Sequence, residues 1–122
     1  MSLKEGDPEH VRGYILYKLY WYLHSWVIPG KDPKRHYPLT DMKKGYPKQW
    51  WGRFDKEFKE LRREGLVHIF SHIGGGEDHI CAVKAEDAVV RGLVCINKYL
   101  ASEKMPNLTI DDLFPKSQPK KR

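Results

Sequence analysis

The chain has 122 residues, a formal net charge of +6 and 40% hydrophobic residues, which is the composition of one globular domain. Its two cysteines, without a recognisable export signal, favour free thiols in a reducing compartment, so we expect a cytoplasmic protein rather than a secreted disulfide scaffold. The longest apolar stretch, residues 14–28, is interrupted by Lys18, His24 and Ser25, which argues against a membrane-spanning helix.

The positive charge is concentrated in one block of the sequence. Residues 31–63 hold 11 Lys and Arg against 5 Asp and Glu, whereas residues 64–115 have an excess of four acidic side chains. Residues 116–122 add four basic side chains. Such an asymmetry indicates a surface that binds a polyanion.

The first expected element is a helix over residues 9–27. Asp7 is a suitable N-cap, and Pro8 suits the first helical turn. Apolar side chains occupy nearly the whole circumference of this helix, which predicts that it is buried on more than one side. Such burial requires other elements of the chain or a second subunit.

Two further helices are expected in the basic block. A short helix covers residues 39–44, with Thr40 as its cap and Gly45 ending it in the left-handed conformation. A longer helix begins at residue 47, where a proline suits the first turn, and ends at Gly65.

The longer helix has two chemically different faces. Apolar side chains at helical spacing form a core stripe about 80° wide: Trp50, Phe54, Phe58 and Leu61. The opposite face is mainly cationic and has two polar side chains on its flank: Lys48, Gly52, Lys56, Lys59 and Arg63, then Gln49 and Arg53. The basic block is therefore also one face of a helix, which favours polyanion binding over a merely solvated surface.

A β-hairpin and a last helix are expected next. Residues 66–73 and 78–84 are rich in Val, Ile, Phe and His, and the Gly-rich turn at residues 74–77 predicts that they pair as a hairpin. Residues 85–101 have the apolar spacing of a helix, and residues 108–114 are expected to pack locally.

This order of elements resembles a winged helix-turn-helix domain. Residues 40–44 look like its short second helix, and residues 46–49 (Tyr-Pro-Lys-Gln) look like the turn into its recognition helix. Residues 58–67 are similar to the L-x-x-L-x-x-x-G-L-V helix end of many winged-helix proteins, with Phe58 where Leu is more usual. Residues 45–48 (Gly-Tyr-Pro-Lys) also resemble small, poorly characterised archaeal winged-helix proteins.

The resemblance implies an α+β fold with a three-helix core, a β-hairpin wing and, in this chain, an extra C-terminal helix. That domain covers residues 9–105, after a lead of residues 1–8 and before an extended basic tail of residues 106–122. The end of the tail is polar and rich in lysine, so we expect it to be disordered in isolation.

Winged-helix domains most often bind double-stranded DNA with the recognition helix in the major groove. The resemblance therefore implies a DNA-binding transcriptional regulator or chromatin-associated factor, in which Lys48, Gln49 and Arg53 reach base edges. The cations farther along the helix are expected to meet phosphates: Lys56, Lys59 and Arg63. Additional phosphate contacts are expected from the second helix, a loop and the tail: Lys43, Lys44, Lys31, Arg35, Lys120 and Lys121.

Two other partner classes and a dimer remain open. Basic winged-helix proteins also bind RNA or ribosomes, and the basic tail suits that alternative. The acidic wing turn, Gly-Gly-Gly-Glu-Asp at residues 74–78, would repel phosphates and favours a protein-interaction module. The apolar first and last helices suggest a homodimer that forms through them.

The sequence contains no catalytic motif, so we expect neither an enzyme nor a bound cofactor. The Gly-rich turn lacks the Lys-Ser/Thr that follows a phosphate-binding loop. His72, His79 and Cys81 invite a zinc hypothesis because they lie near the hairpin turn. Their spacing fits no familiar zinc pattern, so we expect a polar strand face and a buried thiol without metal.

Overall fold

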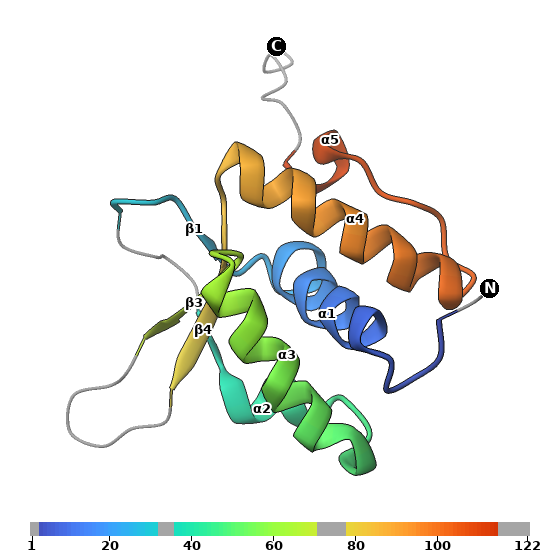
Figure 1. The fold of residues 1–122 in the computed structure, drawn as a ribbon. Helices are drawn as coiled ribbons and strands as arrows, with labels where there is room; N and C mark the ends of the chain where they lie inside the picture. The colour runs from blue at the N-terminus through green and yellow to red at the C-terminus, as the bar shows by residue number, and fades with distance from the viewer. Residues whose placement is uncertain (1–2, 32–35, 71–77, 115–122) are drawn as a thin grey trace.

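A computed structural model describes residues 3–31, 36–70 and 78–114, and its fold is mixed α+β (Figure 1). The helical elements are α1 (Pro8–Tyr17), the π-helix η1 (Lys18–Tyr22), α2 (Leu39–Lys44), the 3₁₀-helix η2 (Lys48–Trp50), α3 (Trp51–Arg63), α4 (Glu86–Ser102) and α5 (Ile110–Leu113). The strands are β1 (Trp26–Val27), β2 (Tyr37–Pro38), β3 (Val67–Phe70) and β4 (His79–Val83). The α+β expectation is confirmed at this level.

β4 is the central strand of the sheet. β3 pairs with it antiparallel along one edge, with Phe70 opposite His79. Two short strands share the other edge, where β1 runs parallel and β2 antiparallel to β4. The predicted strands of the hairpin are confirmed over Val67–Phe70 and His79–Val83, whereas residues 71–73 of the first strand and the turn at residues 74–77 lie outside the described residues. The sequence did not predict β1 and β2.

α1 packs against both α3 and α4 and forms the centre of the core (Figure 1). The buried apolar residues of α1 and η1 are Val11, Tyr14, Ile15, Leu16, Leu19 and Tyr20. Gly13 lets α1 approach α4 closely, since a Cβ there would lie 2.3 Å from the Cβ of Tyr99. Elements of the same chain therefore bury this helix, so its apolar circumference does not require a second subunit. The homodimer stays a prediction, and Val90 and Val94 of α4 are exposed apolar side chains available to it.

The first helical segment ends before the predicted boundary at residue 27. After η1 the chain turns at His24, whose φ is +51°, and Trp26–Val27 enters the sheet as β1. The N–H of Lys84 donates to the carbonyl of Val27 at 2.7 Å, which secures this short strand. Apolar residues 26 and 27 continue the helical spacing, so the sequence pattern alone does not distinguish helix from strand there.

Two predicted end signals of α2 are wrong. Thr40 lies inside the helix, and Pro38 occupies the N-cap position. Gly45 has a right-handed φ of −76°, and a Cβ there would lie 2.2 Å from the hydroxyl of Tyr14, so close packing accounts for this glycine. Gly65, after α3, does adopt the left-handed conformation, with φ at +80°.

The N-terminal lead, residues 3–7, packs on the start of α3. Gly6 has a φ of +91°, and a Cβ there would lie 2.5 Å from the indole of Trp50, so only glycine fits against that ring. Asp7 occupies the predicted N-cap position of α1, but its side chain makes no cap hydrogen bond.

A buried hydrogen-bond chain connects the lead to the end of α4. The Gly6 N–H donates to the Tyr46 hydroxyl at 2.8 Å, and that hydroxyl lies 2.7 Å from Nδ1 of His10. Nε2 of His10 lies 3.0 Å from a carboxylate oxygen of Glu103. Segments that are far apart in sequence are thereby held together on one side of α1.

α4 matches its predicted range, and the segment after it folds back onto it. The side chain of Asn97 exchanges two hydrogen bonds with the backbone of Leu108, at 2.8 and 3.0 Å. A capping box between Thr109 and Asp112 begins α5, and Leu113 is buried. The predicted local packing of residues 108–114 is confirmed. No helix among the described residues is long and apolar enough to cross a membrane.

Candidate nucleic-acid interface

The predicted longer helix is two elements in the structure. The 3₁₀-helix η2 covers residues 48–50, and the α-helix α3 begins at Trp51. Phe54, Phe58 and Leu61 are buried against the core, and Trp50 is partly buried, so the predicted core stripe is confirmed. Burial of this stripe turns the opposite side of α3 toward solvent.

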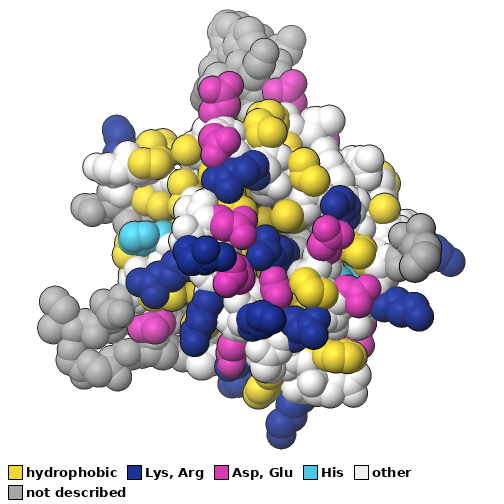
Figure 2. All heavy atoms as spheres, viewed as in Figure 1, with side chains coloured by type: hydrophobic (Ala, Val, Ile, Leu, Met, Phe, Trp, Pro, Cys, Tyr) yellow, Lys and Arg dark blue, Asp and Glu magenta, His cyan; other side chains and the backbone are white. Residues whose placement is uncertain are grey.

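The side of α3 away from the core is cationic and exposed. Figure 2 shows Lys and Arg side chains gathered over the part of the surface where α3 lies in Figure 1, with Asp and Glu among them. The predicted residues that are exposed there are Lys48, Gln49, Gly52, Lys56, Lys59 and Arg63. The acidic neighbours decide how much of this positive charge is available to a ligand.

Arg12 of α1 neutralises two carboxylates near the surface of α3. Its Nε lies 2.8 Å from Oε1 of Glu57, and its Nη1 lies 3.0 Å from Oε2 of Glu64. Burial opposes the charge of Arg12, but hydrogen bonds and attraction from both carboxylates outweigh it and raise the pKa of Arg12. These two acids therefore contribute little negative potential to the exposed side of the helix.

The other two acids of α3 have partners near the surface. Nζ of Lys43 lies 3.1 Å from Asp55, and the ammonium also lies 5.6 Å from the centre of the Trp51 ring. Glu60 pairs with Arg63, whose hydrogen bond lowers the pKa of that carboxyl. Exposed ion pairs of this kind are weak, so Lys43 and Arg63 can exchange their partners for phosphates.

The remaining cations of α2, η2 and α3, apart from Arg53, form a group that we call the cationic face: Lys44, Lys48, Lys56, Lys59 and Arg62. All are exposed, and within residues 3–31, 36–70 and 78–114 none has an ion pair or hydrogen bond. Sequence reasoning missed Arg62, although at 100° per residue it lies only about 60° around the helix from Lys59. The sequence signal for Arg62 is its membership of the basic block together with this angle on the helix.

Arg53 is held differently from the cationic face. Its Nη1 donates to the carbonyl of Gly6 at 2.9 Å, and the side chain is partly buried beside the N-terminal lead. A contact between Arg53 and a base would compete with this hydrogen bond. Lys48 and Gln49 remain exposed on η2 and are the better placed of the residues predicted to reach bases.

The remaining predicted residues do not lie on α3. Lys31 is exposed in the segment after β1 and lines a surface hollow with residues of β3 and β4. Lys44, at the end of α2, belongs to the cationic face. Arg35, Lys120 and Lys121 lie outside the described residues, so their contacts with nucleic acid stay predictions.

The histidines and the thiol of the hairpin do not assemble a metal centre in the described part of the chain, where no group of three suitable ligands occurs. His72 lies outside that part, and Nδ1 of His79 lies 2.6 Å from Nδ1 of His36. Cys81 is buried, and this burial raises the pKa of its thiol to about 12.

Comparisons with family models, with curated proteins and with solved structures found no match for this chain. The function is therefore inferred from the geometry of the cationic face. Exposed Lys and Arg side chains that have no ion pair among the described residues can bind the phosphates of a nucleic acid, since such contacts release condensed counterions. The buried stripe of α3 determines the side of that helix on which Lys56, Lys59 and Arg62 lie.

Proposed function

We propose that this chain is a winged-helix protein that binds double-stranded DNA through the cationic face, as a transcriptional regulator or chromatin-associated factor. The observation that carries the proposal is that the acids of α3 have ion-pair partners of their own. The five members of the cationic face have neither an ion pair nor a hydrogen bond within the described residues: Lys44, Lys48, Lys56, Lys59 and Arg62. The face is thus more positive than the composition of the helix suggests.

The arrangement of elements supports the winged-helix part of the proposal. α2 and α3 follow each other, and the antiparallel pair β3–β4 comes directly after α3. β2, just before α2, adds an antiparallel strand to β4. This order is the one that a winged-helix domain has for its recognition helix and its wing strands, and α1 packs against α3 (Figure 1).

The chemistry of the face favours phosphate contacts over base readout. Four of its five members are lysines, which bind phosphates as flexible point charges. Gln49 is a residue that can pair with adenine, and Lys48 one that can pair with guanine, from the exposed turn η2. We therefore infer strong dependence on salt and modest discrimination between sequences.

Charge reversal on α3 tests the proposal. Lys56→Glu combined with Lys59→Glu should weaken binding of a labelled DNA duplex by about tenfold or more at physiological salt, measured by fluorescence anisotropy. The matched control, Lys98→Glu with Lys104→Glu, makes the same charge change at and just after the end of α4 and should have a much smaller effect.

A structured RNA hairpin, measured at the same salt, separates the alternatives. Tighter binding of the hairpin than of the duplex, lost in the α3 variant, would replace DNA with RNA as the ligand. Failure to bind either nucleic acid with a Kd below about 100 µM would refute the proposal and favour a protein partner.

A further inference from the structure

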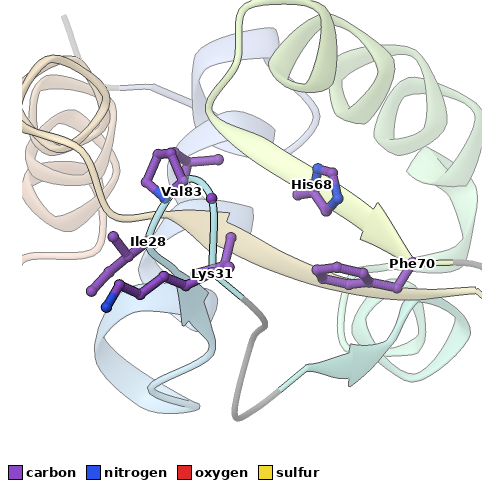
Figure 3. Close-up of a pocket in the computed structure, with 8 residues that line it drawn as sticks. Ile28, Lys31, His68, Phe70 and Val83 are labelled. Carbon is purple, nitrogen blue, oxygen red and sulfur yellow. The ribbon is translucent and has the colours of Figure 1, made fainter.

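A surface hollow beside β3 and β4 has no role in the fold or in the cationic face. It has a volume of about 280 Å³ and is formed by the segment after β1 together with β3 and β4 (Figure 3). Its lining residues are Val27, Ile28, Pro29, Gly30, Lys31, His68, Phe70 and Val83. A volume slightly below the about 300–1,000 Å³ of common ligand pockets suits a single ring system.

Two aromatic rings form one wall of the hollow. His68 and Phe70 alternate along β3 with Val67 and Ile69, which pack toward the core, so both rings lie on the outer face of the sheet. The two ring centres are 4.5 Å apart and the ring planes meet at 66°. A planar guest can therefore stack on one ring and contact the edge of the other without any change to the core.

The opposite wall is apolar and ends in a positive charge. Figure 3 shows Ile28 and Lys31 across the hollow from His68 and Phe70. Lys31 is exposed, and its ammonium has no ion pair among the described residues. Apolar and aromatic walls with a cation at the rim complement a ligand that combines a planar ring with an anionic group.

The hollow and the cationic face are connected through β3. α3 ends at Arg63, and the turn at Gly65 leads directly into β3, which contacts α3 and carries His68 and Phe70. Nη2 of Arg91 donates to the carbonyl of Glu64 at 3.0 Å and anchors this turn to α4. β3 therefore links one wall of the hollow to the helix that carries Lys56 and Lys59.

We propose that this hollow receives one unpaired nucleobase of the DNA held by the cationic face. The base lies between the ring wall of His68 and Phe70 and the apolar wall opposite, and Lys31 contacts the phosphate of the same nucleotide. Base stacking on aromatic side chains tolerates every sequence, so the preference is for a structural feature: a single-stranded overhang next to a duplex. This inference rests on the proposed function.

Two labelled duplexes test it, one blunt and one with a short 3′ or 5′ single-stranded overhang. The overhang should tighten binding by about 5- to 150-fold in anisotropy titrations, as expected for one stacked base. A 2-aminopurine placed in the overhang should lose fluorescence on binding, because stacking quenches it. His68→Ala combined with Phe70→Ala should abolish both effects and leave the affinity for the blunt duplex unchanged.

The control is Tyr22→Ala, which removes an aromatic side chain that is 65% exposed on η1 and does not line the hollow. It should retain the preference for the overhang. Equal affinities for blunt and overhang duplexes, with blunt binding still dependent on Lys56 and Lys59, would overturn this inference and leave the proposed function intact. Loss of the preference in the Tyr22 variant as well would also overturn it.

Discussion

Neutralising Lys56 and Lys59 should lower both the affinity for duplex DNA and its dependence on salt. Each phosphate contact contributes about 0.9 to the slope of log K against log salt concentration. If all five members of the cationic face contact phosphates, the slope is about −4.5, and affinity falls about 500-fold between 50 and 200 mM salt. Lys56→Gln with Lys59→Gln leaves three contacts, a slope of about −2.7 and a fall of about 40-fold.

Anisotropy titrations of one labelled duplex over that range of salt measure both slopes. Lys98→Gln with Lys104→Gln, at and just after the end of α4, serves as the control and should keep the slope of the unmodified protein. A slope that stays near −4.5 in the α3 variant would refute the assignment of these two lysines to phosphate contacts. An equal reduction in the control would show that net charge, rather than the cationic face, determines binding.

Three further outcomes concern stability and reactivity. Gly6→Ala should lower the free energy of unfolding by about 1–3 kcal/mol because of the positive φ and the close ring contact of Gly6. Gly52→Ala should raise the free energy of unfolding by about 0.5–1 kcal/mol, because Gly52 has open space around it. Urea denaturation that shows equal shifts for the two variants would contradict this. His10→Ala should lower the free energy of unfolding by about 1–3 kcal/mol, since both hydrogen bonds of a buried imidazole are lost. A change below about 0.5 kcal/mol would contradict a stabilising role for this hydrogen-bond chain. In a Cys95→Ala variant, Cys81 should react with Ellman's reagent at pH 8 only after unfolding, because its pKa of about 12 leaves almost no thiolate in the folded protein. Rapid reaction of the folded protein would contradict this.

The long periodic elements were predictable from the sequence. α4, the core stripe of α3 and the paired strands of the hairpin each repeat a side-chain pattern over several residues, so local spacing suffices to identify them. β1 and β2 have two residues each and no pattern of their own. They form strands only because they pair with β4, which lies more than 40 residues away in the chain.

The positions of the candidate site were predictable, but the partners of its side chains were not. Angular spacing on a helix places Lys56 and Lys59 opposite the aromatic stripe without any tertiary information. The same spacing places Arg53 beside them, yet its guanidinium bonds to Gly6, which belongs to a lead with no regular structure. A contact across 47 residues depends on how the lead packs, and no local pattern encodes that packing.

Arg12 shows why the charge of a segment differs from the charge of a surface. The first thirty residues are neutral by count, with three Lys and Arg against three Asp and Glu. In the folded chain, Arg12 reaches from α1 to Glu57 and Glu64, so it pairs with acids that otherwise would offset the lysines of α3. Because Glu57 is almost fully buried beside it, this compensation is built into the contact between the two helices. The packing that forms the core thereby also increases the positive potential of the cationic face.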